Sequence, residues 1–392
     1  MDSSLYDLGP AIRLVLLAVM VALGPLAWVW VRRGAADPAA RWRALTRLIL
    51  FLSFDLVLFG AFTRLTDSGL GCPDWPGCYG HASPMGAAAP IAAAEAALPD
   101  GPVTLTKAWI EMIHRYAATM IGVLITVSMA LAWWLQRRHA SPGVLPGWAT
   151  LTFVWVCIQG AFGALTVTMK LQPAIVTLHL LGGYVLLALL VRQAEAGRSQ
   201  VGGPSAGLRR AGAAVLLLVL VQSALGAWVS TNYAVLACSD FPQCQGSWWP
   251  RMDFEHGFTV WRDLGRTGDG ALLPFEALTA IHWVHRLAAV AVLAALLVLA
   301  WALHRHAERS VRHHGQALAL LALWQLASGL SNVVLDWPIV AALAHTGGAA
   351  ALVVVLSSLL MLGRAAAAAP APTAASAPVR CAAAPARSAG PA

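Results

Sequence analysis

The chain has 392 residues, of which 59% are hydrophobic and only 11% are charged, against about 25% charged residues in an ordinary soluble domain. This composition excludes a water-soluble globule, a disordered chain and a fibrous repeat, and six cysteines are too few for a small disulfide scaffold. The net charge of +8 does not indicate a nucleic-acid partner, because Lys and Arg fall in short clusters between long apolar runs.

Nine apolar segments are each long enough to cross a bilayer as a helix, since a hydrocarbon core of about 30 Å needs about 20 residues. The first is longer than the apolar run of a usual signal peptide and follows Asp2 and Asp7, so we interpret it as a retained helix. The sequence therefore predicts an all-α integral membrane protein. The nine spans cover approximately residues 11–31, 46–66, 106–135, 147–168, 173–192, 208–230, 275–303, 315–335 and 338–363.

Positive charge follows every second span. Arginine clusters lie within residues 32–47, 137–138, 192–210, 305–312 and 364–387, whereas the other connections are nearly neutral or acidic. Because Lys and Arg accumulate in cytoplasmic loops, this pattern predicts an N-terminus outside and a C-terminus in the cytoplasm. Residues 364–392 are rich in Ala, Pro and Ser, so we expect a disordered cytoplasmic tail, with Cys381 as a free thiol in it.

Spans two to five and spans six to nine are two copies of one unit. Each copy has a Gly-Ala-aromatic triplet, two outer-loop cysteines, a His-Arg pair, a Gln followed by Gly, and a His followed by two glycines. Because each copy contains an even number of spans, both copies insert in the same orientation, and the repeats are parallel. The predicted architecture is two pseudo-symmetric four-helix bundles, residues 46–195 and 208–363, and an extra helix with a cytoplasmic loop in residues 1–45. The matched residues are Gly60, Cys72, Cys78, His114, Arg115, Gln159, Gly163, His179, Gly182 and Gly183, and then Gly226, Cys238, Cys244, His285, Arg286, Gln325, Gly329, His345, Gly347 and Gly348.

Four histidines lie at similar depth in helices of the same direction: His114 and His179 in the first copy, His285 and His345 in the second. A single buried His often only hydrogen-bonds a neighbouring helix, but two matched pairs favour ligation. Two opposed imidazoles inside an apolar bundle are typical of haem iron, held non-covalently because no Cys-x-x-Cys-His occurs. The glycine pairs after the second histidines would make room for a flat macrocycle or allow close helix packing.

One position breaks the symmetry, because Glu111 stands three residues before His114 where the second copy has His282 before His285. Residues i and i+3 share a helix face, so Glu111 would lie beside whatever His114 contacts. We interpret Glu111 as an acid/base or water-orienting group, the alternative being a helix-pairing hydrogen bond or a pair with Arg115.

The neighbouring polar residues have less specific interpretations. His282 would support an iron ligand without binding iron itself, or contact a haem propionate. Arg115 and Arg286 would extend their side chains to the outer interface of the membrane or pair with haem carboxylates. Asp55 is expected to form a helix–helix hydrogen bond.

Two cysteine pairs, each with five intervening residues, fall in loops on the predicted oxidising side. Cys72 with Cys78 and Cys238 with Cys244 would staple their loops as disulfides, or exchange thiols with a partner. Cys157 lies within a span, where it is expected to be a small buried residue.

These residues together carry a resemblance. The segment from Phe62 to Cys78, FTRLTDSGLGCPDWPGC, with Glu111-Met-Ile-His114-Arg115, His179 and its glycines, His285-Arg286 and His345, resembles the bacterial haem A synthase family over residues 46–363. The resemblance implies an oxidoreductase that converts haem O to haem A for terminal oxidase assembly, by oxidising the C8 ring methyl to a formyl group. It also implies location in the bacterial inner membrane. The family usually has eight spans, so nothing functional is inferred for residues 1–45.

Residue by residue, the resemblance makes His285 and His345 the iron ligands of a haem b cofactor, and His114 and His179 the ligands of the substrate haem O. Glu111 matches the family's essential glutamate, and Cys72 and Cys78 match its outer-loop pair. On this hypothesis haem b carries electrons away from the substrate, and Glu111 handles protons or water at the oxidised carbon.

Two other classes of protein share parts of this pattern. A di-haem b electron carrier, such as a quinol or ferric reductase, would keep both haems and needs no glutamate beside one of them. A transporter built on parallel repeats would line a pathway with the polar residues. The partners expected for the synthase are the lipid bilayer, a haem O synthase that delivers substrate, an electron acceptor that the sequence does not identify, and a second copy of the chain in a homo-oligomer.

Overall fold

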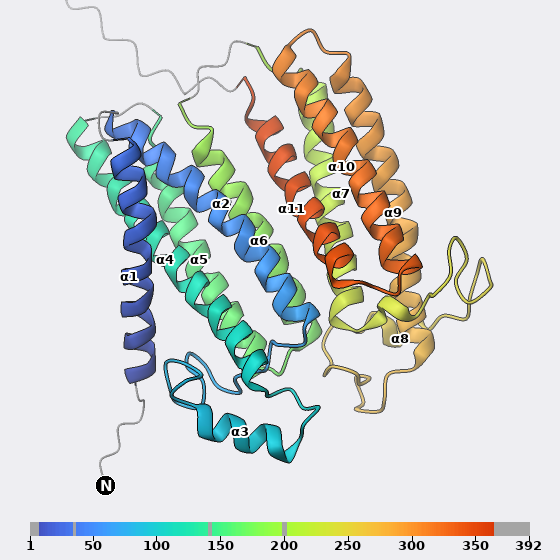
Figure 1. Ribbon diagram of the computed structural model, residues 1–392. Coiled ribbons are helices and arrows are strands. Elements are labelled where there is room, and N and C mark those ends of the chain that lie inside the picture. Colours follow the sequence, from blue (N-terminus) through green and yellow to red (C-terminus); the bar gives the residue numbers. More distant parts are fainter. Residues whose placement is uncertain (1–7, 34–36, 140–142, 198–201, 364–392) are drawn as a thin grey trace, which may run out of the picture.

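The computed structural model describes residues 8–33, 37–139, 143–197 and 202–363 (Figure 1). Within these ranges the chain is helical with only three isolated β-bridges, and nine helices are long and apolar enough to cross a membrane. The predicted all-α membrane fold is therefore confirmed. The spanning helices are α1 (Gly9–Arg32), α2 (Pro38–Leu65), α4 (Leu105–His139), α5 (Pro146–Thr168), α6 (Pro173–Ala194), α7 (Ala206–Thr231), α9 (Phe275–His304), α10 (Arg309–Val334) and α11 (Ile339–Met361).

Local start signals decide where several of these helices begin. Asp37 caps α2 by accepting a hydrogen bond from the backbone N–H of Ala40, and Pro38 takes the first helical position, where its missing N–H costs nothing. Ser205 caps α7 in the same way through the N–H of Leu208. As a result α2 begins eight residues before the apolar segment predicted from the sequence, because apolar length measures the membrane crossing and not the whole helix.

The two four-helix units have the same cyclic order. In the first, α2 packs on α4, α4 on α5, α5 on α6 and α6 on α2; in the second, α7, α9, α10 and α11 repeat the same ring. Figure 1 shows the two bundles side by side. This order makes α4 diagonal to α6 and α9 diagonal to α11. The helices that carry the histidine pairs therefore face each other across the interior of each bundle.

Helix α1 is peripheral to this repeat. It packs along α4 and, less extensively, α2 on the outer side of the first bundle. At its beginning, Leu14 is buried in a small cluster with Cys72, Cys78 and Met112. The extra helix thus supports the first cystine loop from the side, together with Ile91 of the short helix α3 (Ala88–Ala97).

The bundles meet through α6, α7, α11 and α2. At the loop end of this junction, Arg64 donates a hydrogen bond to the backbone oxygen of Ser230 at 2.6 Å and lies 4.0 Å from the centre of the Tyr233 ring. The Tyr233 hydroxyl donates to the carboxylate of Asp67 at 2.6 Å. These contacts join the two halves at the end of the bundles from which the long loops extend.

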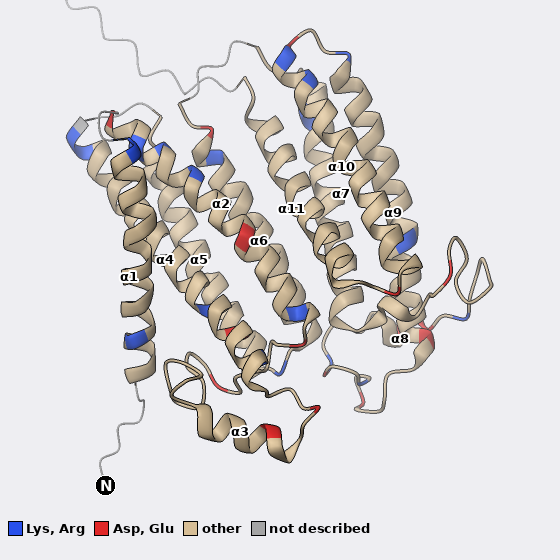
Figure 2. Ribbon diagram, viewed as in Figure 1, with Lys and Arg blue, Asp and Glu red and all other residues tan. Residues whose placement is uncertain are grey.

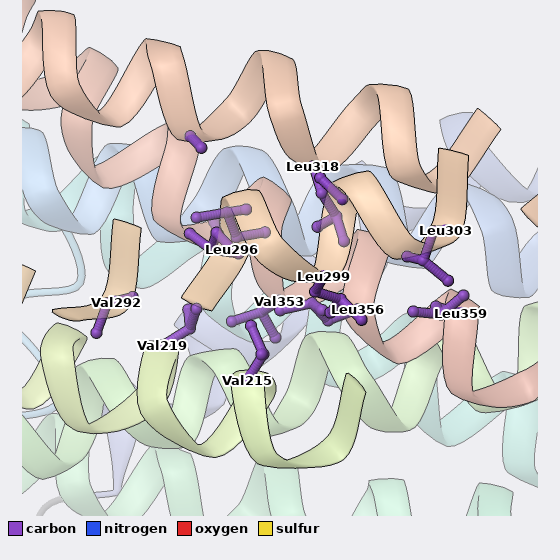
Figure 3. Close-up of a cluster of buried hydrophobic side chains, with 14 of the residues drawn as sticks. Val215, Val219, Val292, Leu296, Leu299, Leu303, Leu318, Val353, Leu356 and Leu359 are labelled. Atoms are coloured by element: carbon purple, nitrogen blue, oxygen red, sulfur yellow. The ribbon is translucent and has the colours of Figure 1, made fainter. Parts of the chain in front are cut away.

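Apolar packing fills the opposite end of the second bundle. Figure 3 shows the buried side chains of this cluster projecting from α7, α9, α10 and α11 toward one another, among them Val215, Leu299, Leu318 and Leu356. Lipid tails are as apolar as leucine, so the hydrophobic effect does not drive helices together inside a bilayer. Close van der Waals packing of this kind supplies much of the free energy of helix association instead. The cluster leaves the part of the bundle nearer the long loops for the polar residues.

Candidate functional site

The four histidines occupy equivalent places in the two bundles. His114 and His285 lie on α4 and α9, and His179 and His345 lie on the diagonal helices α6 and α11. All four lie six to ten residues inside their helices, roughly 9 to 15 Å from the first residue. The imidazoles of His114 and His179 interact electrostatically with each other, as do those of His285 and His345. The structure thus brings together both pairs singled out in the sequence.

Each imidazole lies against a glycine of the neighbouring helix. A Cβ atom added at Gly60, Gly226 or Gly329 would come within 3.1, 2.9 and 3.1 Å of the Cε1 atom of His114, His285 and His345 respectively, and one at Gly163 within 3.6 Å of Cε1 of His179. A larger side chain at the first three positions would displace the ring. These glycines recur at matching positions of the sequence repeat, but the repeat alone does not indicate that they contact the histidines.

The glycine pairs after the second histidines serve close packing. A Cβ at Gly182 would overlap the Gln159 side chain at 2.0 Å, and one at Gly348 would overlap that of Gln325 at 2.5 Å. At Gly183 and Gly347 the nearest atoms belong to side chains of α2. The expectation that these glycines open space for a macrocycle is therefore not met, because α5, α10 and α2 fill the space with their own side chains.

The two histidine pairs differ in the partners of their Nδ1 atoms. In the second bundle, Nδ1 of His285 lies 3.0 Å from the Gln222 amide nitrogen, and Nδ1 of His345 lies 3.0 Å from the Ser328 hydroxyl. In the first bundle, the Nδ1 atoms of both histidines are buried without a hydrogen-bond partner among the described residues. The two bundles therefore have the same helix arrangement but differ in the hydrogen-bond partners of their histidine rings.

Glu111 is buried, with 4% of its surface exposed. Its carboxylate accepts a hydrogen bond from the backbone N–H of Cys72 at 2.8 Å and forms an ion pair with Arg115. Of the alternatives weighed from the sequence, the pair with Arg115 is thus present in the structure. The carboxylate connects the helix of His114 to the first cystine loop.

Arg115 and Arg286 hold the cystine loops through backbone carbonyl oxygens. Arg286 donates to the oxygens of Cys238, Asp240 and Gln243 at 2.7 to 3.0 Å, and its Nε donates to His282 Nε2 at 3.2 Å. Arg115 donates in the same way to a set of loop oxygens, those of Cys72, Asp74, Pro76 and Gly77. The guanidinium donors are engaged by the loops, so each arginine acts as a loop clamp in this structure. His282 accepts a hydrogen bond from Arg286, as Glu111 accepts one from Arg115 at the matching position of the first half.

Both loops are closed by a cystine. The sulfur atoms of Cys72 and Cys78, and of Cys238 and Cys244, are at bonding distance, and all four cysteines are buried. Asp240 accepts hydrogen bonds from the N–H groups of Gly246 and Gln245, and the first of these does most to lower the pKa of its carboxyl. Asp74 makes the equivalent bonds to Tyr79 and Gly80, so the loops share their internal structure.

Three predicted placements have other outcomes. Cys157 is exposed on α5, so its expected burial is wrong. Asp55 is exposed on α2 and makes no hydrogen bond within the described part of the chain, so the expected helix–helix bond is absent there. Where all faces of a span are apolar, sequence pattern does not reveal which face turns inward. Cys381 lies outside the described residues.

Comparison with known proteins bears on this arrangement. Residues 40–357 match the model of the COX15-CtaA family, described as cytochrome oxidase assembly protein. The chain belongs to this family. The match leaves out α1, which is consistent with its position outside the repeat.

Several curated relatives carry the name heme A synthase. The protein from Shewanella oneidensis is 36% identical over 310 residues, which cover 78% of this chain and 91% of that protein. The proteins from Hyphomonas neptunium and Methylobacterium radiotolerans are 28% and 29% identical, over 83% and 74% of this chain and 91% and 81% of their own lengths. The family indicated by the sequence motifs is thereby confirmed.

The loop clamp can be tested without any ligand. Replacing Arg286 with Ala removes the three hydrogen bonds that this charged side chain donates to the loop, each worth about 1.5 to 3 kcal/mol, so the second loop should open more often. We expect a mild thiol reductant to reduce Cys238–Cys244 at least about tenfold faster, since about 1.4 kcal/mol corresponds to a factor of ten. Alkylation of the released thiols, followed by mass spectrometry, measures this rate. The exposed Arg266, changed to Ala, is the control, and equal rates in the two variants would contradict the clamp.

Proposed function

We propose that the protein makes haem A by oxidising a ring methyl of haem O to a formyl group, as an oxidoreductase for terminal oxidase assembly. The observation that carries this proposal is the presence of two matched imidazole pairs on diagonal helices, in a chain of the COX15-CtaA family. The pairs supply sites for two haems, and the family membership and its named relatives support the reaction.

The donor set fits haem. Among the described residues no three His, Cys, Asp or Glu side chains gather as a metal site, so each histidine pair offers two ligands. A porphyrin supplies four ring nitrogens itself and needs only two axial ligands from the protein. The four imidazoles are half-buried, and no hydrogen bond within the described chain engages any of their Nε2 atoms. Those nitrogens are available to bind iron.

We assign the two halves different roles. His285 and His345 would hold haem b, because Gln222 and Ser328 fix their rings as a resident cofactor requires. His114 and His179, whose Nδ1 atoms have no such partners within the described residues, would bind haem O, a substrate that must enter and leave. When bound, haem iron supplies the oxidising chemistry that an inert methyl group needs.

Glu111 is the residue we assign to proton handling. It lies on the same helix face as His114 and is held by Arg115 and by the Cys72 N–H, so its carboxylate has a fixed position beside the substrate half. A positioned carboxyl can take or give a proton as the methyl carbon is oxidised. The second half has His282 at this position and would bind its haem without turnover.

The charge distribution supports an orientation in the bacterial inner membrane. Figure 2 shows Lys and Arg concentrated at the end of the molecule where α2 begins and α4 ends, with acidic residues in the loops at the other end. By the positive-inside rule the first end faces the cytoplasm, with the N-terminus outside. We further propose a haem O synthase as the source of substrate, a separate electron acceptor, and assembly as a homo-oligomer.

Pigment analysis of Glu111→Gln tests the proposed activity. The amide keeps the shape of the carboxyl but cannot carry its proton, so haem A formation in cells supplied with haem O should fall by at least about 100-fold, while haem b content stays unchanged. Extraction and chromatography of the bound haems measure both quantities. Glu95→Gln, the same chemical change on α3, is the control and should alter neither haem A formation nor haem b content. Wild-type protein that carries haem b alone under these conditions would instead indicate an electron carrier.

A second test concerns the glycine beside His285. Gly226→Leu places a side chain where even a Cβ lies 2.9 Å from Cε1 of that ring, so the imidazole must move and haem b should be lost. Gly122→Leu on α4, where a Cβ meets no atom within 4 Å, is the matched control and should keep its haem. The absorption of haem per purified protein decides the outcome, and full occupancy in Gly226→Leu would contradict the assigned geometry.

A further inference from the structure

The Ser328 hydroxyl defines which nitrogen of His345 carries the proton. Its oxygen lies 2.6 Å from the backbone oxygen of Trp324, in the preceding turn of α10, and donates its only hydrogen there. Toward Nδ1 of His345, at 3.0 Å, the same oxygen can therefore only accept. The proton is then on Nδ1, and the lone pair is on Nε2. That is the tautomer in which Nε2 binds a metal.

Gln222 holds the other ring of the second pair. Its amide nitrogen donates to the backbone oxygen of His285 at 3.0 Å and lies 3.0 Å from Nδ1 of the same residue. The amide oxygen is buried and has no hydrogen-bond partner among the described residues. As placed, the amide nitrogen is the donor toward Nδ1. When Nε2 is a ligand and Nδ1 carries the proton, the amide must make a half-turn so that its oxygen accepts a hydrogen bond from Nδ1, and this half-turn gives up the bond to the backbone oxygen of His285.

The first half has apolar residues at both positions. Ser328 directly precedes Gly329, and the residue before the matching Gly163 is Phe162; Gln222 stands four residues before Gly226, and Leu56 stands four before the matching Gly60. The ring of His114 instead lies against Phe59, with the centroids 6.0 Å apart. Neither His114 nor His179 has an acceptor for its buried Nδ1 within the described residues.

We propose that Gln222 and Ser328 are positioning residues that make the second histidine pair a permanent haem site, and that their replacement by Leu56 and Phe162 makes the first pair a site from which haem can leave. This inference rests on the proposed assignment of His285 and His345 as iron ligands. An acceptor at Nδ1 fixes the ring orientation and raises the basicity of Nε2, and loss of such a partner typically costs about 10- to 100-fold in metal affinity. The difference between a cofactor half and a substrate half then lies in two side chains that contact the Nδ1 atoms of the ligand histidines.

The test uses the purified full chain with its haem b, as wild type, Ser328→Ala, Gln222→Leu and the double variant. Transfer of haem to excess apomyoglobin should be about 10- to 100-fold faster in each single variant, and faster still in the double variant. The midpoint potential of haem b should shift to more positive values, because a less basic imidazole stabilises ferric iron less. Ser328→Thr, which keeps the hydroxyl, should restore both quantities toward wild type.

Two controls separate the possible failures. Ser331→Ala removes a hydroxyl from the same helix that bonds only the backbone oxygen of Ala327, and it should change neither quantity. His285→Ala should lose haem b altogether. If His285→Ala keeps its haem, the proposed function has failed. If that variant loses haem while Ser328→Ala and Gln222→Leu match wild type in transfer rate and potential, only the present inference is overturned.

Discussion

The close approach of a glycine-bearing helix to a histidine ring is the constraint on which the site depends. At three of the four histidines, the imidazole crowds the space that a Cβ on the adjacent helix would take, and at His179 the glycine of the adjacent helix is in ordinary contact with the ring. This contact allows α2 to lie close to α4, and α7 to α9, at the level of the rings. The proposed binding of one haem between two histidines depends on this arrangement.

Duplication preserves this backbone arrangement and allows the two halves to diverge. Both bundles have the same ring of helices, the same cystine loop and the same arginine clamp beneath it. They differ in the residues near the histidines. The first half has Glu111 and the apolar Leu56 and Phe162, and the second half has His282, Gln222 and Ser328 at the matching positions. On the proposed function, a duplicated fold of this kind would hold one haem firmly and present the other for reaction, because the groups that contact the histidine rings differ between the halves.

Much of this could be predicted from the sequence, because the bilayer and the repeat are strong constraints. The length of the apolar segments predicted the nine spans, and the recurrence of His, Gly and Cys in one order singled out both histidine pairs. The sequence did not reveal that Gly60 and Gly226 touch the histidines, that the Gly182 and Gly348 positions are filled by glutamine side chains, or that Arg286 clamps a loop. These features depend on helix rotation and tertiary contact, and a span that is apolar on every face carries little information about its rotation.

The central claim is that iron binds between His285 and His345, and low-temperature electron paramagnetic resonance of the oxidised protein loaded with haem b alone tests it most directly. The account predicts the low-spin ferric signal of two imidazole ligands, which disappears in His345→Ala and persists in His179→Ala. A bis-imidazole signal that survives in His345→Ala and disappears in His179→Ala would contradict it.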